Sequence, residues 1–373
     1  MKKILLVIFF TAVFIVVNIQ SVVAQETDFQ RQEHFEAVIT KVLENSEIIE
    51  EDGNRHPYQR LQMTGTSGKL KNKTFIIENG KLNQVGITEY NKGERVILSI
   101  SKDHSGKDII QITDFVRRTP LYLLAAIFVL LTIIIGGKRG ASSILGMALT
   151  FGLLFLYVLP QLSSGANPFL VTSIASLIII PVTFFLSHGY SRKTISAIIG
   201  TFIALIITGV LAYIFIEQSH LTGFASEEAG FLDVMKEGTI DIRGLLFAGI
   251  VIALLGILED ITVSQAAIVY QLKSANNKLT HLELFKRAMD IGRDHIASMA
   301  NTLILVYAGA SLPLLLLFIN NPLPFSSVIN TEMIAEEIVR TLVASIGLIL
   351  AVPITTAITA LIASFQKTKS AKS

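Results

Sequence analysis

The chain has 373 residues, of which 51% are hydrophobic and 16% charged, with a mean hydropathy of +0.60. This composition is too apolar for a soluble globular protein and indicates a membrane protein. The absence of cysteine excludes disulfides, thiolate metal sites and a cysteine nucleophile, while the net charge of +2 excludes little because the charges are unevenly distributed.

Residues 1–24 have the pattern of a signal peptide. Lys2 and Lys3 precede the apolar run 4–17, and small residues suit cleavage after Ala24. An uncleaved anchor helix is the alternative, because the apolar run is somewhat long. In either case the segment that follows is expected to be exported.

Residues 25–118 differ in composition from everything after them, and we expect a small extracytoplasmic domain. Turns that contain Gly and Asn separate five runs rich in β-forming residues. This pattern predicts a small β-barrel of the OB-like kind. The runs are "FEAVITKVL", "YQRLQMTG", "KTFIIENG", "ERVILSISK" and "DIIQITDF".

The charge of this β-domain limits its partners. Its 14 Lys and Arg residues balance 15 Asp and Glu residues, so a nucleic-acid surface is not expected, and the partner considered for it is an extracytoplasmic one. His34, His56 and His104 are scattered along it and give no metal-ligand spacing. We predict no metal site and no cofactor.

Residues 119–366 carry seven apolar runs, each about as long as a transmembrane helix. The expected fold is therefore a membrane α-helical bundle of about seven transmembrane helices behind the β-domain, followed by a basic tail at 367–373. The predicted helices cover 120–136, 140–160, 167–187, 195–216, 244–264, 297–319 and 338–363.

The distribution of Lys and Arg predicts the orientation of this bundle in the cytoplasmic membrane. Alternate connections together with the tail carry twelve of these residues, and the opposite connections carry three. Since basic connections stay inside, the C-terminus is expected in the cytoplasm and the β-domain outside. The acidic loop 217–243 is predicted either to lay a short helix on the membrane surface or to form a packed loop.

Two neighbouring predicted helices carry polar residues at or near the hydrocarbon. Glu259 and Asp260 lie near the predicted inner edge of one helix. Asp290, Asp294, Ser298 and Asn301 recur at helical spacing at the start of the next. Charges in lipid are costly unless paired or hydrated. The predicted intramembrane cluster consists of Glu259, Asp260, Arg293, Asp294, Asn301 and Thr302.

Arg293 is the expected cation of this cluster. It can reach Asp290 by local spacing, or pair with Glu259 or Asp260 on the neighbouring helix, which is the arrangement we predict. The cluster then either seals the ends of two helices or lines a path for a solute or ion.

Two long stretches resemble the paired signature of the YibE/F family of bacterial membrane proteins. They read "IDIRGLLFAGIVIALLGILEDITVSQAA" and "AMDIGRDHIASMANTLILVYAGASLPLLLLF", and "ITDFVRR" resembles the end of the family's soluble domain. The resemblance covers about residues 40–365. It implies a polytopic membrane protein with an exported N-terminal domain, and brings no established activity, substrate or catalytic residue.

The polar cluster favours a transporter or permease for an unknown small solute. The alternative is a non-transporting scaffold or sensor that presents the β-domain to a partner. An enzyme is not favoured, because the sequence contains no HExxH, GxSxG or phosphate-loop motif, and no catalytic residue is predicted.

Reporter fusions test the orientation. Because basic residues are retained inside, fusions near Lys138, Arg192, Lys278 and the C-terminus should report a cytoplasmic location. Fusions after Asn167, within 220–240 and after Asn321 should report the opposite side. A C-terminus found outside would contradict the predicted topology.

Overall fold

The computed structural model describes residues 33–49, 55–80, 88–102, 108–319 and 324–365, so the predicted signal peptide and basic tail lie outside the described residues. Two compact units divide the chain, one of residues 24–131 and one containing 132–373. The first holds a β-sheet and the second a helical bundle, which confirms the predicted fold class.

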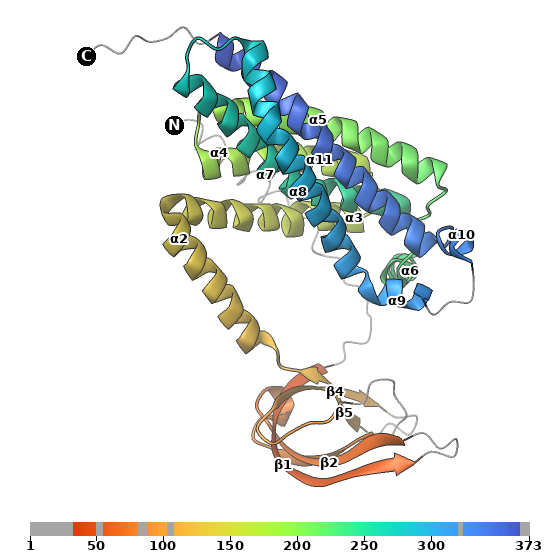
Figure 1. Ribbon diagram of the computed structural model, residues 1–373. Helices are drawn as coiled ribbons and strands as arrows, with labels where there is room; N and C mark the ends of the chain where they lie inside the picture. The colour runs from red at the N-terminus through yellow and green to blue at the C-terminus, as the bar shows by residue number, and fades with distance from the viewer. Residues whose placement is uncertain (1–32, 50–54, 81–87, 103–107, 320–323, 366–373) are drawn as a thin grey trace. The chain divides into compact units, whose positions relative to one another are not determined.

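The sheet of the first unit has five antiparallel strands in the order β3-β2-β1-β4-β5 (Figure 1). Each overlaps one of the five predicted runs. The central strand β1 is long and shifts register twice along β2, which lets it bend around the core and gives a half-barrel. The strands are β1 Glu33–Ile49, β2 Arg55–Gly65, β3 Thr74–Asn79, β4 Arg95–Lys102 and β5 Asp108–Phe115.

Apolar and polar residues alternate along the strands, so the apolar side chains gather on one face of the sheet and form its core. Ala37 and Ile39 on β1 face Leu61 and Met63 on β2, and all four side chains are fully buried. Burying each of the three larger side chains, Ile39, Leu61 and Met63, contributes about 1.5–3 kcal/mol. The β-domain therefore has a hydrophobic core of its own.

Arg118 joins this sheet to the helix that follows. It is the first residue of α2 (Arg118–Leu153), and its Nη2 binds the Glu36 carboxylate on β1 at 2.8 Å. Arg95 reaches the same carboxylate from β4 at 3.4 Å. The start of the helix is thus held against the sheet by charge-assisted hydrogen bonds.

Five helices in the described residues are long and apolar enough to cross a membrane, or six if the bent pair α8 and α9 is one span. Seven spans are therefore not confirmed. The stretch Arg118–Ser163, which counts as one span, joins the first two predicted helices across a kink at Gly137, where the backbone is non-helical (φ 58°, ψ −137°). Pro160, next to the π-helical turn Leu154–Val158, lies inside that stretch.

The remaining long helices follow the predicted runs, in three cases with longer ends. Helix α7 continues eleven residues past its predicted end, α8 begins sixteen residues before its predicted start, and α11 begins six residues before its own. The helices are α3 Leu159–Ser163, α4 Pro168–His188, α5 Arg192–Gln218, α6 Glu227–Met235, α7 Ile242–Ala275, α8 His281–Ala310, α9 Leu312–Ile319, α10 Phe325–Val328 and α11 Glu332–Ser364.

Helices α5, α7 and α11 pack against one another and form the centre of the bundle (Figure 1). On this centre, α8 packs against α11 and α7, and α4 packs against α7 and α5. The short helix α6 lies in the acidic loop, with Phe231 and Val234 exposed. The described residues of the bundle thus place α11 in contact with three other long helices.

The β-domain is expected to fold without the bundle, since its core is self-contained. A soluble fragment of residues 25–118 should give a β-type circular dichroism spectrum and a cooperative thermal transition. Leu61→Ala in that fragment should lower its stability by about 2–5 kcal/mol, because it empties a buried site. A fragment with no transition would show that the sheet needs the membrane helices.

Candidate functional site

The predicted pair between Arg293 and the carboxylates of α7 is wrong. Arg293 Nη1 binds Asp290 Oδ1 on its own helix at 2.7 Å, which is the local alternative. Both side chains are about 70% exposed (70% and 69%). In the described part of the chain, no ion pair joins Arg293 to Glu259 or Asp260. Order along the chain made the two helices neighbours, but it did not define which face each helix turns to the other.

Glu259 and Asp260 lie toward α4 instead. The partly buried Glu259 carboxyl group shares a hydrogen bond with Thr183, and Asp260 lies within electrostatic range of His188 at the end of α4. Lys193 and Arg139 also lie within electrostatic range of His188. Sequence analysis missed Thr183, because a threonine inside an apolar run gives no signal of its own.

Asp294, Asn301 and Thr302 lie on an exposed face of α8, away from the bundle's centre. The Thr302 hydroxyl donates to the Ser298 carbonyl at 3.0 Å. Asn301 has no side-chain hydrogen bond among the described residues. The six predicted residues therefore do not form one site: two face α4, and four lie on exposed turns of α8.

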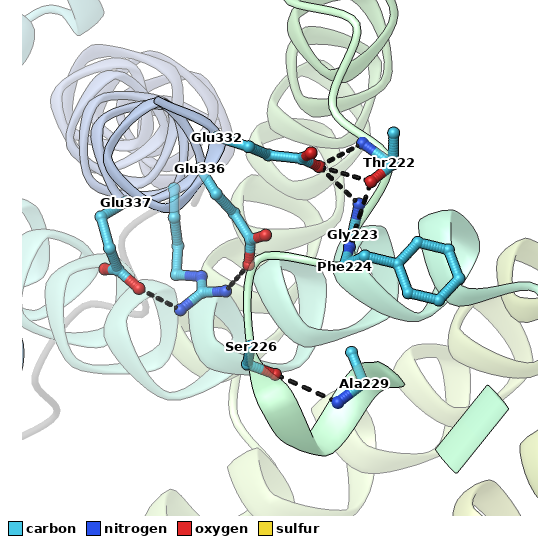
Figure 2. A network of polar contacts seen from close by, with 9 residues as sticks. Thr222, Gly223, Phe224, Ser226, Ala229, Glu332, Glu336 and Glu337 are labelled. Carbon is cyan, nitrogen blue, oxygen red and sulfur yellow. Dashed lines mark hydrogen bonds and ion pairs between the residues drawn. The ribbon is translucent and has the colours of Figure 1, made fainter. Parts of the chain in front are cut away.

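A different group of charged residues converges at the N-terminal end of α11. We call it the carboxylate–arginine cluster, and Figure 2 shows its surroundings. Arg340 Nη2 binds Glu336 Oε1 at 2.5 Å, and its Nη1 binds Glu337 Oε1 at 2.6 Å. The cluster consists of Glu332, Glu336, Glu337 and Arg340.

Glu336 is the most buried charged residue of this cluster. It is 8% exposed, and its second carboxylate oxygen, Oε2, is buried with no hydrogen-bond partner. An unsatisfied buried carboxylate oxygen is energetically costly. Glu336 therefore retains an unused acceptor that points into the protein.

Glu332 ties this end of α11 to the loop after α5. One of its oxygens accepts hydrogen bonds from the Thr222 amide at 2.6 Å, the Thr222 hydroxyl at 2.7 Å and the Gly223 amide at 3.1 Å (Figure 2). Next to this loop, Arg243 at the start of α7 binds Glu217 at the end of α5 at 2.8 Å. The ends of α5, α7 and α11 are thus joined by charge-assisted contacts.

Helix α8 contributes to the same end and then breaks. Tyr307 lies within electrostatic range of Arg340 and Glu337. Three residues later the helix ends at Ala310, and α9 continues from Leu312 at an angle of 72°. Pro313 in the first turn of α9 has no amide hydrogen, which favours the break at this point. The carboxylate–arginine cluster therefore lies beside a discontinuous helix.

Fully buried polar side chains continue along the centre of the bundle. The Thr201 and Thr262 hydroxyls are 2.8 Å apart and join α5 to α7. Gln265 on α7 donates to the Ala288 carbonyl on α8 at 2.9 Å. Gln265 Oε1 and the hydroxyls of Thr355 and Thr359 on α11 are buried without a partner. These buried oxygens are further hydrogen-bond acceptors that a polar ligand inside the bundle could use.

The chemistry available at these positions is binding by oxygen and guanidinium groups. Three carboxylates against one Arg give the carboxylate–arginine cluster an excess of negative charge. Among the described residues, no three His, Cys, Asp or Glu side chains are placed to hold a metal ion. Sequence analysis missed this cluster because its acids precede the apolar run of α11 and were assigned to a loop.

Breaking the Arg340–Glu336 pair should destabilise the bundle. Arg340→Met leaves the buried Glu336 carboxylate without its cation, and we expect a loss of about 2–3 kcal/mol, seen as a melting temperature in detergent lower by roughly 4–10 °C. Glu336→Gln combined with Arg340→Met should lose less than the sum of the single changes.

Arg293→Met is the matched control, because the Arg293–Asp290 pair is exposed and should contribute less than about 1 kcal/mol. Strict additivity of the two cluster substitutions, or an equal loss in the control, would contradict the assignment.

Comparison with known proteins identifies the membrane part of the chain. The sequence model of the family described as YibE/F-like protein matches residues 124–365, which contain all of the long helices except the first turns of α2. Comparisons with curated proteins and with solved structures returned no match. The family match includes both signature stretches on α7 and α8 and covers well over half of the sequence. The chain therefore belongs to the YibE/F-like family.

Proposed function

We propose that this protein is a permease of the cytoplasmic membrane that moves a small solute across it. The observation that carries the proposal is the carboxylate–arginine cluster beside the break between α8 and α9. In this proposal the β-domain lies outside, the C-terminus lies in the cytoplasm, and the cluster is at the extracytoplasmic end of the bundle.

Energetic cost supports a binding role for the cluster. A charged side chain inside a transmembrane helix costs at least about 2.5–3.5 kcal/mol at the centre and less near an edge. A protein that serves only as an anchor has no need for three carboxylates there. Glu336, with one oxygen unpartnered and buried, supplies an acceptor for a cation or for a hydrogen-bond donor.

The broken span supports movement of a solute. Membrane transporters commonly build their sites where helices are discontinuous, because the freed backbone groups at the break can line a cavity. In this protein the 72° bend between α8 and α9 follows Tyr307 by one turn, and Tyr307 lies within electrostatic range of Arg340 and Glu337. The excess of carboxylates favours a positively charged solute.

One observation favours the alternative of a scaffold or sensor. Residues 24–131 form a compact unit with a core of their own. Such a unit suits a domain that is presented to an extracytoplasmic partner, with the bundle as its anchor. In that case the function would depend on the β-domain and not on Glu336.

Solute profiling separates the two functions. A strain that lacks the gene is complemented with the wild type, Glu336→Gln or Arg293→Met, and uptake and efflux are measured for a panel of inorganic and organic cations and neutral solutes. We expect the deletion and Glu336→Gln to change flux of the same solutes by at least fivefold, with Arg293→Met close to wild type.

Two results would contradict the permease. One is that no solute responds to the deletion. The other is full complementation by Glu336→Gln together with failure of a chain lacking residues 33–115, which would support the scaffold or sensor instead.

A further inference from the structure

Helix α8 has two different faces, and only one of them has a partner within the described residues. Leu284, Ala288, Gly292 and Leu303 are buried against the bundle. The opposite face is exposed or, at Ala308, half-buried. We call this face the α8 seam. Its residues are Ile291, Asp294, Ser298, Asn301, Leu305 and Ala308.

The seam has the spacing of a coiled-coil interface. From Ile291 to Ala308 its members are separated by three, four, three, four and three residues. This is the heptad pattern that keeps one face of a helix turned toward a second helix. The seam differs from a lipid-facing surface in its residue types, because Ser, Asn and Ala are enriched where membrane helices contact one another.

Asn301 is the residue that most requires a partner. It lies in the predicted span 297–319, and its neighbours Ile304 and Leu305 are exposed apolar residues. Its carboxamide makes no hydrogen bond among the described residues, and an amide without a partner in an apolar medium costs roughly 4–8 kcal/mol. Whatever covers the seam must both donate to and accept from this group.

The first half of α2 does not match this requirement. Between Thr119 and Gly136 its only polar side chains are Thr119, Tyr122 and Thr132, and the rest are apolar. A carboxamide is best matched by another carboxamide, because each supplies both a donor and an acceptor. The same group at the same depth is present in another molecule of this protein.

We propose that the α8 seam is a self-association surface, on which a second copy of this chain docks through its own α8. Copies inserted in the same orientation are related by a two-fold axis along the membrane normal, so the two α8 helices run parallel. Asn301 then meets Asn301 of the second copy, and hydrogen bonds of this kind between side chains favour helix association in a membrane. Ala308 and Ser298 allow the helices to approach closely.

The charged end of the seam is compatible with this arrangement. Asp294 lies in the seam, and Arg293 flanks it with its side chain 70% exposed. In a parallel pair, Asp294 of each copy faces Asp294 of the other before the predicted span 297–319 begins, where water can hydrate both carboxylates. The inference is independent of transport, since it uses neither the carboxylate–arginine cluster nor the broken span.

Disulfide crosslinking tests the seam, and the absence of native cysteine makes the test direct. Single variants Asn301→Cys and Leu305→Cys are oxidised in membranes and run on denaturing gels without reductant. Leu177→Cys on α4 and Ile206→Cys on α5 are matched controls, because these apolar side chains are 60% and 65% exposed. We expect a band of twice the chain's mass for both α8 variants, at least fivefold stronger than for the controls.

Substitution of Asn301 provides a second measurement. In the Leu305→Cys background, Asn301→Leu should weaken the dimer band several-fold, whereas Asn301→Gln should retain most of it. Gel filtration in detergent confirms that each variant is folded. Absence of the dimer band, equal crosslinking in the controls, or a band whose mass fits a different protein would overturn the proposal.

Discussion

The bundle depends on the close approach of α11 to α5. A Cβ atom on Gly200 of α5 would lie 2.3 Å from Thr355 Oγ1, and one on Gly347 of α11 would lie 2.4 Å from Thr208 Oγ1. Each helix thus places a glycine opposite a threonine of the other. In lipid, where apolar side chains gain little by leaving the solvent, such tight contacts are the main source of helix association. With α11 held in this way, α7 and α8 both pack on it, and its charged N-terminal end meets the loop after α5.

The sequence predicted the elements of this fold better than their relations. The five strands follow from alternation and turns, and the long helices follow from apolar runs, because both signals depend on local spacing. The number of spans was less certain, because the first two predicted helices are joined across a kink at Gly137 and the sixth predicted span breaks after Ala310. The residues around such a position do not by themselves distinguish a turn between two helices from a bend within one helix.

The candidate site shows the same limit. Glu259 and Arg293 were expected to meet because their helices are consecutive, but pairing depends on how each helix is rotated about its axis. The first turn of α11 was missed for a related reason. Its acids form a local network with Arg340, and α11 is therefore helical from Glu332 onward, where composition alone indicates a loop. A three- and four-residue spacing between acids and one Arg is the signal that could have revealed it.

The contact made by Glu332 has a consequence for how the protein tolerates changes in length. Its carboxylate oxygen holds two successive backbone amides, at Thr222 and Gly223, only four and five residues after α5 ends. An insertion between Gln218 and Thr222 would displace both amides, while Gly223, whose missing Cβ would meet the Ile242 carbonyl at 2.7 Å, leaves no room for the chain to take another route. The segment after Ser226 has no such anchor to α11 among the described residues. Variation in loop length within the family should therefore accumulate around α6 and avoid the few residues before it.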